Sequence, residues 1–91
     1  MYNGANRIQS ITASGTTFTT VSAHNLAVND YVRFFVTGGT SYSGINPLQA
    51  YKILTTPTTT TFTVGLVQDT GSISSAVNAG SAGTGSVSVG L

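Results

Sequence analysis

Residues 31–37 read YVRFFVT, and this stretch decides the class of fold. Its side chains fall into two alternating sets. The set that we expect to face a core consists of Val32, Phe34 and Val36. The set that we expect to face outward consists of Tyr31, Arg33 and Phe35. Alternation with period two and a high content of β-branched and aromatic residues are typical of a β-strand. The stretch therefore predicts a strand that buries only one of its faces.

The same pattern recurs on both sides of this strand. Further strands are predicted over residues 7–14, 16–22, 51–54 and 62–66, with a last short strand around Ile73. Apolar residues nowhere follow the period of 3.6 that a helix requires. Short strands separated by Gly, Asn and Pro turns indicate an all-β fold, a small antiparallel β-barrel or sandwich. The predicted core consists of Ile8, Phe18, Leu26, Val32, Phe34, Val36, Tyr51, Ile53, Phe62, Val64 and Leu66.

The composition divides the 91 residues into three parts. Residues 1–6 are small and polar and predict a flexible N-terminal arm, and residues 7–75 form the predicted barrel domain. Residues 76–91 are almost wholly Ala, Gly, Ser, Val and Thr, so we expect a flexible C-terminal arm that cannot fold alone. Its end, residues 86–91, alternates and is expected to add as a strand to a neighbouring protein, a disordered tail being the alternative. Deleting residues 86–91 should then leave the barrel folded.

Charge is scarce in this chain. Its formal net charge is +1, and its charged residues are Arg7, Asp30, Arg33, Lys52 and Asp69. Long-range repulsion therefore hardly opposes association with other protein. A domain of this size has a thin margin of stability, and the chain has no cysteine for a disulfide. Both features favour a subunit that is stabilised by contact with other protein. The chain has no signal-peptide pattern and no apolar run near the ~20 residues of a membrane span, so we expect no membrane partner.

Candidate catalytic residues are few. The single histidine, His24, could pair with a hydroxyl group and with Asp30 or Asp69 as orienting carboxylate, but Ser and Thr are so frequent that this combination arises by chance. We expect instead that His24 and Asn25 hydrogen-bond the backbone of the loop that leads to Leu26. Two isolated carboxylates also make a glycosidase pair or a calcium site improbable. The sequence therefore predicts no enzyme and no catalytic, cofactor or metal site.

The outward face of residues 31–37 is a candidate binding surface. Aromatic side chains beside an arginine are found on platforms that bind single-stranded nucleic acid. Three cations in the whole chain cannot supply the phosphate contacts that such binding needs, so we expect no nucleic-acid partner. Aromatic residues and arginine are also enriched in protein interfaces, and we expect that use here. The predicted interface residues are Tyr31, Arg33, Phe35, Val87, Val89 and Leu91.

Three stretches resemble a known family. They are AHNLAVNDYVRF at residues 23–34, NPLQAYKI at 46–53 and TTFTV at 60–64. Together they resemble a small β-barrel module of tailed-phage virion proteins, which is similar to the first catalytic-cysteine half-domain of ubiquitin-activating enzymes. The likeness concerns the barrel and implies no ubiquitin chemistry. The residues at core positions of the module are Leu26, Val32, Tyr51 and Phe62.

The chain departs from this module at its turns. Asn25 and Asn29 stand where the module usually has glycine, and asparagine is the next best residue at positive φ. Pro47 stands where the turn after Asn46 usually has glycine. We therefore expect Asn25 and Asn29 to adopt positive φ.

The resemblance implies a virion structural protein. A small barrel with uncharged arms is expected to be a capsid cement (decoration) protein on the virion surface. It would form homotrimers that clamp the outside of the major capsid protein shell through many modest contacts. The first alternative is a component of a phage tail, neck or fibre. The second is a carbohydrate-binding or receptor-binding module, for which the candidate residues are Tyr31, Tyr42 and Tyr51.

Overall fold

A computed structural model describes residues 9–90 of the protein. These residues form seven β-strands and no helix. The strands are β1 (Gln9–Ser14), β2 (Thr17–Thr20), β3 (Tyr31–Thr37), β4 (Ala50–Thr55), β5 (Thr61–Val67), β6 (Ile73–Ala76) and β7 (Ser86–Gly90). The all-β prediction is confirmed. The strand predicted at residues 31–37 is β3, which has the same bounds. The predicted arm at residues 1–6 lies outside the described residues.

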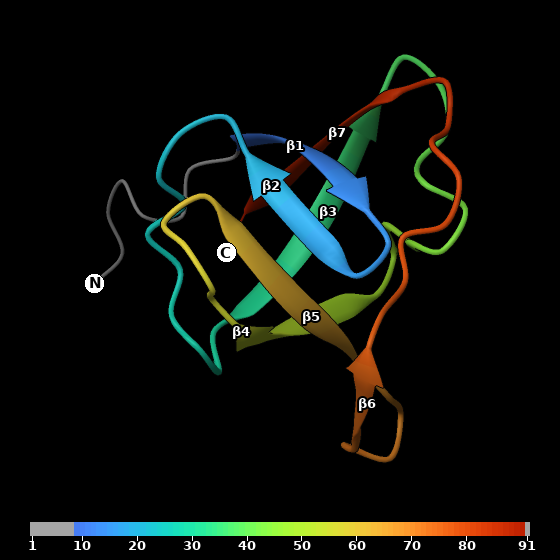
Figure 1. The fold of residues 1–91 in the computed structure, drawn as a ribbon. Coiled ribbons are helices and arrows are strands. Elements are labelled where there is room, and N and C mark those ends of the chain that lie inside the picture. The colour runs from blue at the N-terminus through green and yellow to red at the C-terminus, as the bar shows by residue number, and fades with distance from the viewer. Residues whose placement is uncertain (1–8, 91) are drawn as a thin grey trace.

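Six of the strands close into an antiparallel barrel. Around the barrel, β1 is followed by β2, β5, β4, β3 and β7, and β7 pairs with β1 to complete the circle. The remaining strand, β6, extends the sheet from the end of β5 and projects from the barrel (Figure 1). Of the two architectures that the sequence predicted, the structure therefore has the barrel.

Aromatic side chains fill the barrel interior. Phe18 lies opposite Phe62 in the pairing of β2 with β5, and their ring centroids are 5.5 Å apart. Phe34 contacts Phe18 from the other side of the barrel at 5.3 Å and Tyr51 at 5.2 Å. The buried core consists of Ile11, Phe18, Val32, Phe34, Ile45, Tyr51, Ile53, Phe62, Val64, Ala79, Val87 and Val89.

Most of the predicted core is confirmed. Seven of the predicted residues are buried, and Leu26, Val36 and Leu66 are partly buried against the core. Ile8 lies outside the described residues. The buried residues that the sequence did not predict are Ile11, Ile45, Ala79, Val87 and Val89. Three of these come from the segment that was predicted to be an arm.

The prediction of a free C-terminal arm is wrong for residues 76–90. The predicted strand exists as β7, but it pairs with β1 on one side and with β3 on the other, within the same chain. Val87 and Val89 point into the core and are 5% and 3% exposed. The other strands leave a gap between β1 and β3, and β7 closes it. Its alternation thus reflects a strand of the barrel wall.

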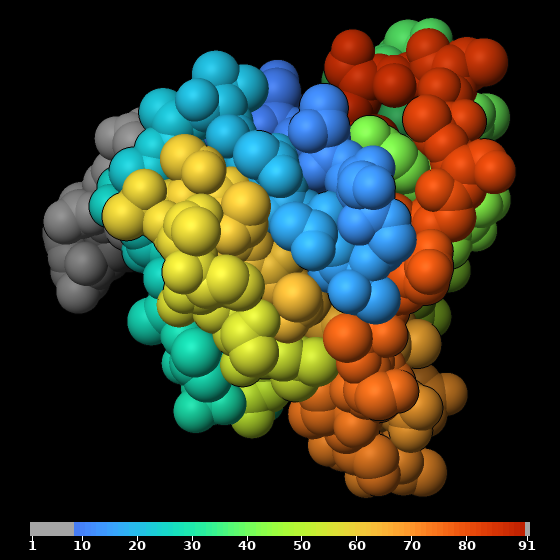
Figure 2. Space-filling view, viewed as in Figure 1, coloured from blue at the N-terminus to red at the C-terminus, as the bar shows by residue number. Residues whose placement is uncertain are grey.

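Residues 77–85, which lead to β7, are held against the loop between β3 and β4. Backbone groups of Ser43 and Gly44 donate to the carbonyl oxygens of Ser81 and Ala79 at 2.8 and 2.7 Å. The two segments lie side by side at one corner of the molecule (Figures 1 and 2). A Cβ atom on Gly44 would overlap the backbone of residues 78–79. The glycine at position 44 of the β3–β4 loop therefore permits close backbone packing against residues 77–85.

Candidate protein interface

The outer face of β3 carries two large exposed aromatic side chains. Tyr31 is 55% exposed and Phe35 is 41% exposed, and Arg33 lies exposed between them. Because successive side chains of a strand point to opposite faces, burial of Val32 and Phe34 in the barrel turns these three residues outward. Tyr31, Arg33 and Phe35 are therefore exposed, as the sequence predicted.

The neighbouring strands shape the surroundings of Arg33. Across the strand pairs, Arg33 lies opposite Ala50 of β4 and Gly90 of β7. Neither residue has a side chain long enough to cover a guanidinium. Arg33 donates from Nη2 to the carbonyl oxygen of Leu48 at 3.2 Å. Leu48 itself is 83% exposed, beside the aromatic strand face.

A second cation joins this face from β4. Lys52 lies opposite Tyr31, and its Nζ is 5.6 Å from the centroid of the Tyr31 ring, within cation–π range. Tyr31, Arg33, Phe35, Leu48 and Lys52 together are named the β3–β4 face below. Lys52 follows from the sequence, because Tyr51 and Ile53 were predicted to face inward. The position of Leu48 on this face was not predicted from the sequence, because Leu48 lies in a turn, outside any alternating stretch.

The charges on the β3–β4 face are all positive. Arg33 and Lys52 are the cationic side chains of residues 9–90. Of the two acids, Asp30 accepts a hydrogen bond from the backbone N–H of Ala27 at 2.9 Å. Asp69 lies in the turn between β5 and β6. The face therefore combines aromatic and aliphatic area with two cations.

The other predicted interface residues do not belong to this face. Val87 and Val89 are buried in the barrel, so the prediction that they contact a partner is wrong. Leu91 lies outside the described residues. The error arises because alternation looks the same in a strand that joins a neighbour and in one that completes its own barrel.

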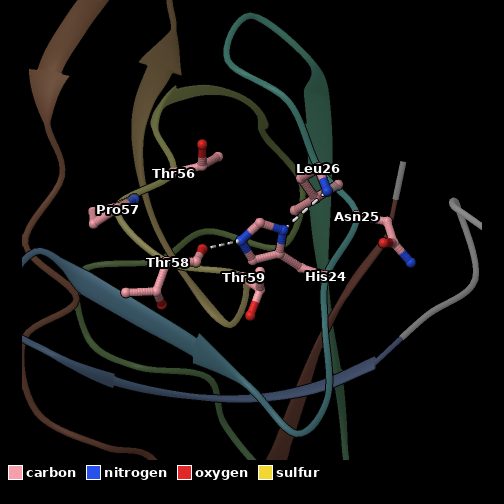
Figure 3. Close-up of a pocket in the computed structure, with 7 residues that line it drawn as sticks. All are labelled: His24, Asn25, Leu26, Thr56, Pro57, Thr58 and Thr59. Carbon is pink, nitrogen blue, oxygen red and sulfur yellow. Dashed lines mark hydrogen bonds between the residues drawn. The ribbon is translucent and has the colours of Figure 1, made fainter.

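A hollow of about 360 Å³ lies beside His24, at the end of the barrel where the β2–β3 loop meets the β4–β5 turn. Figure 3 shows the residues that line it: His24, Asn25, Leu26, Thr56, Pro57, Thr58 and Thr59. No charged side chain lines it. Its surface is a mixture of hydroxyl groups and of the apolar side chains of Leu26 and Pro57.

His24 joins the two loops through its ring. Nδ1 accepts a hydrogen bond from the backbone N–H of Leu26 at 2.9 Å, so the ring proton is on Nε2 (Figure 3). Nε2 donates to the carbonyl oxygens of Thr58 and Thr61 at 3.1 and 3.0 Å. The ring also packs edge-on against Phe62, with centroids 5.6 Å apart. The predicted hydrogen bond of His24 to the loop backbone is confirmed.

The turns around His24 have the predicted backbone conformation. Asn25 has φ 56° and Asn29 has φ 79°, as expected for residues at glycine positions.

The turn at Asn46-Pro47 lies in the loop between β3 and β4. The side chain of Asn46 accepts a hydrogen bond from the backbone N–H of Leu48 at 2.9 Å. This bond closes the turn at Asn46-Pro47 without a glycine.

Among residues 9–90, no three His, Cys, Asp or Glu side chains gather in a group that could hold a metal ion. The same part of the chain has no helix with the length and apolarity needed to cross a membrane. Comparison with models of protein families, with curated proteins and with solved structures found no match to this chain.

Proposed function

We propose that this protein is a structural subunit of a virion that binds the outside of the capsid shell through its β3–β4 face. The observation that carries the proposal is the exposure of Tyr31, Phe35 and Leu48 around Arg33 on a closed barrel. Aromatic residues and arginine contribute most of the binding energy in many protein interfaces. The virion assignment itself comes from the sequence resemblance to the phage barrel module.

The mechanism differs from the one that the sequence predicted. Residues 86–90 belong to the barrel wall, so they do not add to a neighbouring sheet. Each subunit instead presents a preformed surface whose backbone is fixed by strand pairing. Little conformational entropy is lost when such a surface binds. We propose that three subunits assemble together, so that modest contacts of each barrel add up on the shell.

A pelleting experiment tests the proposal. Shells of the major capsid protein, assembled without this chain, are mixed with the wild-type protein or with Tyr31→Ser/Phe35→Ser and centrifuged. The wild type should pellet with the shells, whereas the double variant should stay in the supernatant. The matched control is Val21→Ser, because Val21 is 79% exposed but follows β2, which pairs with neither β3 nor β4. A wild-type protein that does not pellet contradicts the proposal.

Solution mass tests the proposed trimer. Light scattering at several concentrations should give three times the 9.3 kDa mass of the chain. A monomer at all concentrations contradicts trimer formation in solution. Rings of six or more subunits would favour a place in the tail instead.

A further inference from the structure

We infer that the partner of the β3–β4 face presents a carboxylate to Arg33, with apolar side chains on both sides of that carboxylate. The inference rests on the proposed function, since it assumes that this face binds a protein. It adds the chemistry that the partner must have.

The spacing along β3 defines the order of the contacts. Tyr31, Arg33 and Phe35 are alternate residues of one strand, so neighbouring side chains stand about 6.5–7 Å apart. Arg33 thus leaves β3 between two aromatic residues, and its guanidinium reaches the carbonyl oxygen of Leu48. A partner that covers all three positions meets an aromatic, then a cationic, then an aromatic side chain. An acidic residue between two apolar residues is the complement of this order.

The hydrogen-bonding capacity of Arg33 requires an acceptor at the centre. A guanidinium has five N–H donors, and the Leu48 carbonyl oxygen takes one of them, from Nη2. Ala50 and Gly90 on either side leave the group open to a partner. Burying this cation without an anionic acceptor would be strongly unfavourable. A carboxylate matches the planar donor fork of arginine and accepts two parallel hydrogen bonds.

Lys52 adds to the preference for an acidic partner. It lies next to Tyr31 on the same face, so both cations of residues 9–90 face the partner. Asp30 directly precedes Tyr31, but its carboxylate accepts a hydrogen bond from the Ala27 N–H, and Asp69 lies in the turn between β5 and β6. A single-stranded nucleic acid also carries negative charge, but its affinity grows with the number of phosphates neutralised, and two cations provide few.

Zero-length cross-linking tests whether the partner presents acidic residues to this face. Lys52 is the only lysine in the sequence, so a carbodiimide can couple shell carboxylates only to Lys52 or to the terminal amine. The bound wild-type complex should give an amide between Lys52 and an Asp or Glu of the shell protein, identified by mass spectrometry. Lys52→Arg is the matched control, because it keeps the charge but has no amine to couple. Shell-bound Lys52→Arg should give no such cross-link, which assigns the amide to Lys52 and not to the terminal amine.

Substitutions of Arg33 provide the second measurement. Arg33→Met, which keeps length but removes the charge, should raise the concentration for half-saturation of the shells at least tenfold. Arg33→Glu should abolish pelleting, while circular dichroism of both variants stays that of the wild type. A wild type that never pellets overturns the proposed function. A wild type that pellets, gives no Lys52 cross-link and binds as tightly as Arg33→Met overturns this inference alone. So does displacement of the bound protein from shells by micromolar single-stranded oligo-dT.

Discussion

Thr40 and Thr84, 44 positions apart in the sequence, hold each other by a reciprocal pair of hydrogen bonds. The backbone N–H of Thr40 donates to Oγ1 of Thr84 at 3.1 Å, and the backbone N–H of Thr84 donates to Oγ1 of Thr40 at 3.0 Å. The backbone N–H of Gly85 adds a third bond to the Thr40 carbonyl oxygen at 2.9 Å. These bonds fix the chain immediately before β7. They explain how a segment of small residues reaches a defined place in the barrel.

Replacing one of these hydroxyls should loosen that attachment. Thr84→Ala removes the acceptor for the Thr40 N–H, and we expect a loss of about 0.5–1.5 kcal/mol in the free energy of unfolding. Thr84→Ser keeps the hydroxyl and should lose less than half as much. Urea unfolding curves of the three proteins measure the difference. Equal stability of Thr84→Ala and the wild type would show that the reciprocal pair contributes nothing.

Deletion of residues 86–91 should unfold the protein. The structure reverses the earlier expectation that the barrel survives this deletion, because β7 supplies two core side chains and pairs with both β1 and β3. Circular dichroism and amide NMR spectra should show a disordered chain. A folded truncated protein would mean that β1 and β3 can close the barrel without β7.

Single substitutions in β7 separate packing from chain length. Val89→Ala removes buried apolar area opposite Phe34, and we expect a loss of about 1–3 kcal/mol. Ser88→Ala changes the adjacent, half-exposed position and should stay within about 0.5 kcal/mol of the wild type. If Ser88→Ala unfolds at a lower urea concentration than Val89→Ala, the assigned faces of β7 are reversed.

His24 should stabilise the fold through its ring nitrogens. It is 6% exposed, and His24→Ala would remove the partners of the Leu26 N–H and of two threonine carbonyl oxygens. We expect a loss of about 2–4 kcal/mol in the free energy of unfolding. Thr59→Ala, at an exposed position of the same hollow, serves as control and should change stability little. A His24→Ala protein as stable as this control would refute the role of the ring as a bridge between loops.

The positive φ of Asn29 allows a matched pair of substitutions. At φ 79°, an alanine is strained by its Cβ, so Asn29→Ala should cost about 1 kcal/mol. Asn29→Gly has no Cβ and should stay within about 0.5 kcal/mol of the wild type. Thermal unfolding of both variants gives the comparison. The backbone conformation would be disproved by an alanine variant more stable than the glycine variant.

Phe34 should be among the most sensitive core positions. It is 1% exposed and contacts Phe18 and Tyr51 through their rings. Phe34→Ala is expected to cost about 3–5 kcal/mol, which is a large part of the stability of so small a domain. Phe35→Ala, one position along on the outer face, is the control and should remain folded. A well-folded Phe34→Ala protein would place the core on the other face of β3.

The wall of the barrel was largely predictable from local pattern. Phe34 and Phe62 each sit in a run of period two, and alternation alone assigns such residues to one face of a strand. Ile45 and Ala79 are also buried, but they lie in loops, where no period marks the buried positions. Their burial depends on which loops meet, and that is a matter of tertiary contacts.

The candidate interface was predictable only in part. Outward alternation in β3 identified Tyr31, Arg33 and Phe35, and the same reasoning for β4 places Lys52 outward. Leu48 joined the face only because the turn at Asn46 brings its carbonyl group to Arg33. A hydrogen bond between positions 15 apart leaves no periodic trace in the sequence.

By itself the sequence determined the all-β class, most strand positions, and the inward and outward faces of β3. These follow from side-chain alternation, which is a local property of an extended chain. The tertiary structure decided the partners of each strand, and above all that β7 inserts between β1 and β3 of its own chain. The alternation of residues 86–90 is compatible with pairing to any free sheet edge. Pairing within the same chain results from the edges of β1 and β3 and from the hydrogen bonds between Thr84 and Thr40, which are contacts between residues far apart in the chain.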